Sequence, residues 1–129
     1  MKNILFVCVE NSCRSQLAEA FGHMHTSSDV TVYSAGSNPS GQVNPKAVAT
    51  MAELGYDMGS HYSQSLDEMP VIDYDAVITM GCGDNCPWVK GRIREDWGLP
   101  DPKHLTEDEF RATRDEIEKR VIDLLGRLN

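Results

Sequence analysis

The stretch that most constrains the fold is a short loop between an apolar run and a helical pattern. The apolar run is Ile4-Leu5-Phe6-Val7, and apolar residues recur at helical spacing from Ser15 onward. Backbone amides of a tight loop that opens a helix favour a bound oxyanion and the ionised form of a cysteine. Arg14 adds a planar set of donors that suits paired oxyanion oxygens. The loop reads Cys8-Val9-Glu10-Asn11-Ser12-Cys13-Arg14-Ser15.

Strands and helices alternate along the rest of the chain. Apolar patterning predicts further strands at 29–36, 74–80 and 92–97, and helices at 45–55, 65–69 and 106–128. This order predicts an α/β fold in which residues 1–129 form a single domain, a four-stranded parallel sheet flanked by helices on both faces. Ligands of such sheets bind at the carboxyl ends of the strands. Cys8, the cysteine loop after the third strand and the Asp101 turn after the fourth should therefore gather at one edge.

Composition excludes several classes of protein. The 12 basic and 20 acidic side chains give a net charge of −8, which argues against general nucleic-acid binding. The N-terminus does not resemble a secretion signal, and no apolar segment is long enough to span a membrane. We therefore expect a cytoplasmic monomer whose thiols are kept reduced. Four cysteines in that compartment indicate catalysis, redox chemistry or metal binding rather than a disulfide framework.

A structural zinc site is one alternative for the cysteines. Cys82 and Cys86 could bind zinc together with Cys8 and Cys13, but their spacings fit the paired ligands of such sites poorly. We therefore predict neither a metal nor a bound cofactor. The four histidines are predicted to be surface residues, and the Glu10 carboxylate, which would repel an oxyanion, is expected to point outward. The histidines are His23, His25, His61 and His104.

The first loop resembles the signature of the low-molecular-weight protein tyrosine phosphatase family. The residues that match the signature are Cys8, Asn11, Cys13, Arg14 and Ser15. The resemblance continues through Ser34-Ala35-Gly36, Val43-Asn44-Pro45 and Pro100-Asp101-Pro102, and it implies the phosphotyrosine-phosphatase-I-like fold. Within that fold the chain is most similar to the thioredoxin-coupled arsenate reductases, which carry two further cysteines after the third strand. Cys82 and Cys86 stand at that place.

The resemblance implies a mechanism. Cys8 would attack the arsenic of arsenate while loop residues 9–15 bind the oxygens, Ser15 would hydrogen-bond the Cys8 sulfur, and Asp101 would protonate the departing hydroxide. Cys82 and then Cys86 would carry a disulfide relay that thioredoxin reduces. Phosphate and sulfate are expected to compete with arsenate. The loop residues that would bind the oxyanion are Val9, Glu10, Asn11, Ser12, Cys13, Arg14 and Ser15.

Two other readings of the same residues stay open. A phosphatase would need Cys8, Arg14 and Asp101 but neither Cys82 nor Cys86. Phosphatases of this fold usually carry Ser-Pro after the arginine and Asp-Pro-Tyr near the C-terminus, where this chain has Ser15-Gln16 and Asp101-Pro102-Lys103. A non-catalytic thiol sensor would leave Arg14 and Asp101 without a role.

The side chain of Cys13 is expected to be structural. Glu19 and Ser34 match positions that help to hold potassium in some relatives, but no remaining ligand is evident.

Overall fold

A computed structural model of the chain describes residues 2–26, 29–81, 88–100 and 102–128. Its sheet has four strands, β1 (Lys2–Cys8), β2 (Val30–Gly36), β3 (Tyr74–Thr79) and β4 (Gly91–Asp96). The strands lie in the order β2-β1-β3-β4, and every neighbouring pair is parallel. The predicted four-stranded parallel sheet is confirmed, with strand ends that differ from the expected ones by one or two residues.

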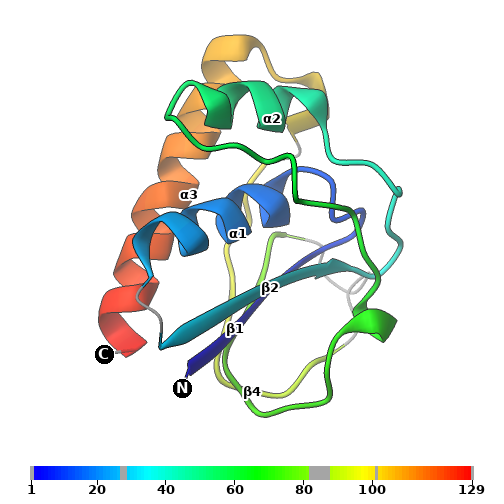
Figure 1. The fold of residues 1–129 in the computed structure, drawn as a ribbon, viewed down its shortest axis with the longest axis vertical. Coiled ribbons are helices and arrows are strands. Elements are labelled where there is room, and N and C mark those ends of the chain that lie inside the picture. Colours follow the sequence, from blue (N-terminus) through cyan, green and yellow to red (C-terminus); the bar gives the residue numbers. More distant parts are fainter. Residues whose placement is uncertain (1, 27–28, 82–87, 101, 129) are drawn as a thin grey trace.

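The three α-helices pack on one face of this sheet, as Figure 1 shows. They are α1 (Arg14–His25), α2 (Pro45–Ala52) and α3 (Glu107–Leu128). Successive side chains of β1 point to opposite faces, so Phe6 packs under the α-helices while Leu5 lies on the other face. There the cover is Leu66 from the 3₁₀ helix η1 (Leu66–Glu68), together with Met69. Helical segments therefore flank both faces, but the α-helices flank only one.

Some apolar side chains in and next to the helices are exposed. They are Met24 near the end of α1, Val48 within α2 and Leu54 just beyond α2. Helix α2 is shorter than its pattern suggests, because it ends at Ala52 and Leu54 lies in the following turn.

Among the described residues, no helix combines the length and the apolar character needed to cross a membrane.

The strand order creates a switch point between β1 and β3. The chain runs from β1 to β2 on one side and then returns to place β3 on the other side of β1. Cys8 is the last residue of β1, and the Met80 amide just after β3 donates to the Val7 carbonyl at 3.0 Å. Ligands of open parallel sheets bind where neighbouring connections diverge in this way. Cys8 therefore sits where the topology alone favours a site.

The side chain of Asp96 holds the residues just before the second cysteine segment. The Asp96 carboxylate accepts from the Gly81 amide at 2.6 Å and from the Thr79 hydroxyl at 2.8 Å. Gly81 has a φ of 84°, a conformation that glycine adopts without strain. The end of β4 thus fixes the exit of β3, from which the segment bearing Cys82 and Cys86 departs. Residues 82–87 and Asp101 lie outside the described residues.

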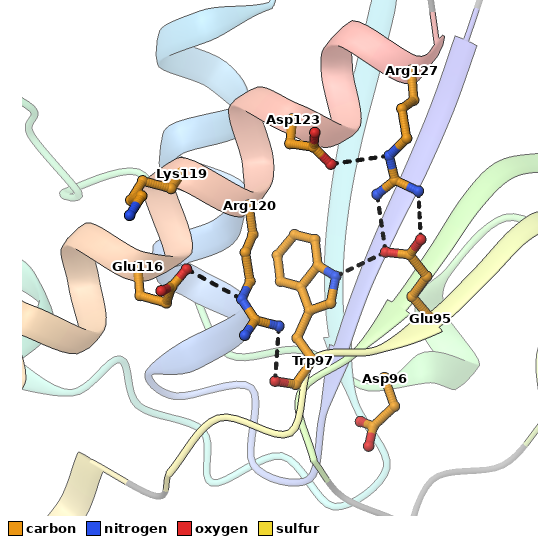
Figure 2. Close-up of a pocket in the computed structure, with 8 residues that line it drawn as sticks. All are labelled: Glu95, Asp96, Trp97, Glu116, Lys119, Arg120, Asp123 and Arg127. Atoms are coloured by element: carbon orange, nitrogen blue, oxygen red, sulfur yellow. Dashed lines mark hydrogen bonds and ion pairs between the residues drawn. The ribbon is translucent and has the colours of Figure 1, made fainter.

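An ion-pair cluster joins α3 to the end of β4 (Figure 2). The Arg127 guanidinium binds the Glu95 carboxylate through two nitrogens, and the Trp97 indole donates to the same carboxylate at 3.0 Å. Hydrogen bonds from Arg127 and Trp97 lower the pKa of Glu95 to about 2. Arg120, about two turns earlier in α3, donates to the Trp97 carbonyl. The cluster anchors the last strand to the last helix.

The approach of α1 to β2 yields a stability prediction. A methyl group on Gly22 would lie 2.9 Å from Cγ1 of Val32, which is closer than packed carbons come. We expect Gly22→Ala to destabilise the fold by about 1–3 kcal/mol, since overpacking outweighs the gain in helix propensity. Gly126→Ala is the matched control, because its added methyl group has open space in α3. It should stabilise by about 0.5–1 kcal/mol. Urea unfolding measures both, and a stabilised Gly22→Ala would contradict the packing.

The Glu95 cluster yields a pH prediction. Because the folded pKa of Glu95 lies below its ordinary value of 4.5, the stability it contributes is present above pH 4.5 and is lost as the pH falls toward 2. We expect Arg127→Leu to cost about 1 kcal/mol at neutral pH, a modest value because water screens a partly exposed pair. The difference from wild type should shrink between pH 4.5 and pH 2. Urea unfolding across this range, with Arg92→Leu on β4 as control, tests it; a pH-independent difference would contradict it.

Candidate active site

The loop between β1 and α1 leaves the first turn of the helix open to an anion. Helix α1 begins at Arg14 with Cys13 as its N-cap, and the Cys13 side chain makes no capping hydrogen bond. The first turn carries no acidic residue. The first backbone amides of a helix have no partner within the helix, and they bear the positive end of its dipole. The amino end of α1 is therefore suited to an oxyanion.

Every carbonyl group from residue 8 to residue 13 accepts a hydrogen bond from outside the loop centre. The donors are backbone amides of residues 17, 37, 38, 40 and 44 and the side chains of Gln16 and Ser63. The described peptide bonds are all trans, and a trans peptide directs its N–H opposite to its C=O. Anchoring the carbonyls on the outside therefore turns the amides inward. The Asn11 amide follows this rule, because it donates to the Cys8 sulfur at 3.1 Å.

The Cys8 sulfur lies at the centre of this arrangement and is buried, with 3 % of the residue exposed. Its second contact is the Ser15 hydroxyl at 2.8 Å. The Asn11 side-chain amide donates to the same hydroxyl oxygen at 2.8 Å, which leaves the hydroxyl proton of Ser15 to point at the sulfur. Two hydrogen-bond donors directed at one sulfur suit a cysteine that acts as a nucleophile. The contact that the resemblance implied between Ser15 and Cys8 is thus present.

Arg14 bridges the loop to the far side of the site. Its Nη1 donates to the Met80 carbonyl after β3 and to the Leu99 carbonyl, at 2.9 Å, after β4. Because both bonds leave from Nη1, they do not use the Nε and Nη2 hydrogens, which form a fork that fits two oxygens of one anion. Arg14 therefore ties together the two segments that lead to Cys82 and to Asp101.

Asn11 holds the loop in a conformation that its backbone would not choose alone. Its φ is 49°, in the left-handed region, which asparagine tolerates better than most residues. The side chain is fully buried, and its oxygen accepts from the Gln64 amide at 2.9 Å and from Gln16 Nε2 at 3.0 Å. Gly36 allows the loop to approach β2, since a methyl group there would lie 2.5 Å from the Val9 carbonyl oxygen.

A hydrogen-bond chain continues behind Asn11 and includes the buried side chain of His61. The prediction that His61 is a surface residue is wrong, because its side chain is 2 % exposed. Its Nδ1 donates to Gln16 Oε1 at 2.9 Å, and its Nε2 accepts from the Tyr56 hydroxyl at 2.7 Å. Burial lowers the pKa of His61 despite the nearby charge of Glu19. No periodic pattern surrounds His61, so the sequence carried no signal of its burial.

Glu19 lies beside this chain and is ionised. Burial raises the pKa of Glu19, but hydrogen bonds from His23 and Ser34 outweigh it, so its pKa falls below the ordinary value. The Ser34 hydroxyl donates to Oε1, while His23 Nε2 lies 3.1 Å from Oε2. The carboxylate is therefore held from both sides, about one helical turn beyond the loop.

The other predicted residues are placed as follows. Cys13 is a buried side chain in the hydrophobic core, and Glu10 is half-buried and lines a small pocket with Ser12 and Asn44. Val9 and Ser12 belong to the anchored loop through their carbonyls. Cys82, Cys86 and Asp101 lie outside the described residues, so their roles stay predictions. The outward orientation of the Glu10 carboxylate also stays a prediction.

A sizeable pocket lies elsewhere, away from Cys8. It has a volume of about 750 Å³ and lies between β4 and α3, around the cluster of Figure 2. Its arginines are engaged, Arg127 with Glu95 and Arg120 with Glu116 and the Trp97 carbonyl. The residues that line this pocket include no cysteine, and both of its arginines are already bound to partners. Chemistry is therefore better placed at Cys8.

Comparisons with known proteins now settle the family. The family model described as low molecular weight phosphotyrosine protein phosphatase matches residues 3–129. The chain belongs to this family. A glutaredoxin arsenate reductase from a Synechocystis strain is 39 % identical over 100 % of both chains.

Two solved structures extend the comparison. An arsenate reductase in the phosphate binding state has a TM-score of 0.91 at 39 % identity, with 100 % of both chains covered. A thioredoxin-dependent arsenate reductase from Corynebacterium glutamicum has a TM-score of 0.78 at 32 % identity and covers 98 % of this chain and 61 % of its own. The resemblance of the sequence to arsenate reductases of the phosphatase fold is thus confirmed.

The close approach of Gly36 to the loop yields a binding prediction. In Gly36→Ala the new methyl group must displace the Val9 carbonyl or the Asn11 amide, which lies 2.9 Å from it. Because that amide also contacts the Cys8 sulfur, we expect phosphate affinity to fall by at least about tenfold, or about 1.4 kcal/mol. Calorimetric titration with phosphate measures the change, and Gly126→Ala serves as the remote control. Unchanged phosphate affinity in a folded Gly36→Ala protein would show that the loop does not form the anion site.

Proposed function

We propose that this chain, acting as a single domain over residues 1–129, is an arsenate reductase. The observation that carries the proposal is the Cys8 sulfur, held by two donors in a loop whose carbonyls are all anchored outward. In the first step the Cys8 thiolate bonds to the arsenic of arsenate while one arsenic–oxygen bond breaks. Asp101 gives the departing oxygen a proton, and Arg14 and the loop amides stabilise the charge on the remaining oxygens.

The second part of the reaction transfers two electrons. The Cys82 thiolate attacks the Cys8 sulfur, the electron pair of the sulfur–arsenic bond passes to arsenic, and arsenite leaves. Cys86 then attacks Cys82, which frees Cys8 and leaves a Cys82–Cys86 disulfide. Support for this order is the position of Met80, whose carbonyl binds Arg14 and whose amide binds β1, two residues before Cys82. The relay therefore starts from a point fixed against the nucleophile loop.

The reductant is proposed to be thioredoxin, with no cofactor bound to the chain. One structural neighbour is described as thioredoxin-dependent, while the Synechocystis relative is named for glutaredoxin. Both donors reduce disulfides by thiol exchange, so they serve the same relay. Reaction in a reducing cytoplasm suits this chemistry and a role in arsenic detoxification, and phosphate and sulfate are proposed as competing oxyanions.

Serine variants of the three cysteines test the relay. With arsenate, thioredoxin, thioredoxin reductase and NADPH, we expect Cys8→Ser and Cys82→Ser to release no arsenite. Cys86→Ser should release one arsenite per chain and then stop, because the Cys8–Cys82 disulfide cannot be passed on. Arsenite is measured by rapid quench and NADPH by absorbance, with Arg92→Leu as the control that keeps activity. Multiple turnover by both Cys82→Ser and Cys86→Ser would refute the relay, and a parallel glutaredoxin assay identifies the donor.

The alternative function is phosphatase activity, which the family description favours. It uses the same oxyanion loop but no distal cysteine. Hydrolysis of an aryl phosphate by wild type at a rate far above arsenate turnover, unchanged in Cys82→Ser, would establish it in place of the reductase. Weak hydrolysis alone would reflect only the shared anion site.

A further inference from the structure

A cluster of three potential metal ligands lies outside the residues that the reaction uses. Glu19 and His23 stand one turn apart on α1, and His61 reaches them from the segment that follows α2. Glu19 Oε2 is 3.1 Å from His23 Nε2 and 3.4 Å from His61 Nδ1, and all three atoms lie within 4.8 Å of one another. We propose that Glu19, His23 and His61 form a site for one divalent transition-metal ion of the zinc class.

The distances suit such an ion. Ligand atoms about 2.1 Å from a tetrahedral zinc ion are about 3.4 Å from one another. The two distances from Glu19 are already close to this value, and only the two histidines must approach. His23 can supply that movement, because its side chain is 42 % exposed and lies at the surface. Its exposure also gives an ion a route to the more deeply buried Glu19 and His61.

The ligand types select the class of ion. Two imidazoles and one carboxylate are typical of zinc, cobalt, nickel and iron sites, whereas magnesium and calcium favour sites made of oxygen. A tetrahedral ion would keep one position for water, since the described residues offer three ligands here. A cation held only by the oxygens of Glu19 and Ser34 would not involve His23. The role of His23 therefore separates the proposed site from a general cation site.

The surroundings already orient two of the ligands. The Tyr56 hydroxyl lies 2.7 Å from His61 Nε2, the ring nitrogen that would stay free, and the Ser34 hydroxyl donates to the other oxygen of Glu19. Partners of this kind fix the ring tautomer and the carboxylate in protein metal sites. With metal bound, His61 Nδ1 gives up its proton and its bond to Gln16, and Nε2–H donates to Tyr56. The chain thus supplies ligands and their supports together.

A zinc titration tests the proposal without arsenate turnover. Thiolates also bind zinc, so every protein carries Cys8→Ser, Cys82→Ser and Cys86→Ser, and excess potassium chloride occupies any unspecific cation site. Competition with a chromophoric zinc chelator should give one zinc per chain. Adding His23→Gln should weaken binding at least about tenfold, since loss of even an outer partner costs that much. The matched control is His25→Gln, two residues away on α1 and paired with Glu118.

A second measurement shows that the variants fold and bind in the folded state. Zinc should raise the melting temperature of the starting protein and of His25→Gln but not that of His23→Gln, because only binding to the native state stabilises it. The proposal is overturned if the starting protein binds no zinc, if His23→Gln binds it equally well, or if His25→Gln loses affinity to the same extent. None of these results depends on whether the chain reduces arsenate.

Discussion

The structure of the site depends on the hydrogen bonds of one buried side chain, that of Asn11. Its amide nitrogen binds Ser15 on the side of the nucleophile, and its oxygen binds Gln16 and the Gln64 amide on the side of the scaffold. Buried amide groups must find partners for both ends, so the geometry has few alternatives. The same residue takes the left-handed conformation that turns its own amide toward Cys8. Asn11 therefore couples the position of the sulfur to the body of the protein.

A second constraint joins the loop to the other strands. Arg14 lies at the start of α1 but donates to carbonyls after β3 and β4. A residue of the oxyanion loop therefore also holds together the segments that follow these two strands. Asp96 and Gly81 fix the exit of β3 in the same region. The loop that bears Cys8 is thus held beside the fixed end of β3, from which the segment with Cys82 continues. This arrangement suits a reaction in which the Cys8 sulfur first attacks an oxyanion and is then attacked by a second cysteine. The geometry thus supports reduction as well as anion binding.

Much of this could be predicted from the sequence because it depends on local patterns. The apolar run before Cys8, the helical spacing after Ser15 and the cysteine–arginine interval place a nucleophile loop without any knowledge of tertiary contacts. The parallel sheet followed from the alternation of elements. The burial of His61 could not be predicted, since it results from packing against Gln16 and Tyr56. The exposure of Leu54 likewise depends on where α2 ends.

The sequence by itself determined the fold class, the loop that bears Cys8 and Arg14, and the strand ends where the site would form. These features arise from residue spacing within single elements and from the rules of parallel sheets. Only the tertiary structure decided that the α-helices share one face, that Arg14 binds the ends of two other strands, and that Glu19, His23 and His61 meet. Such contacts join segments far apart in the chain, and only the folded packing fixes their distances.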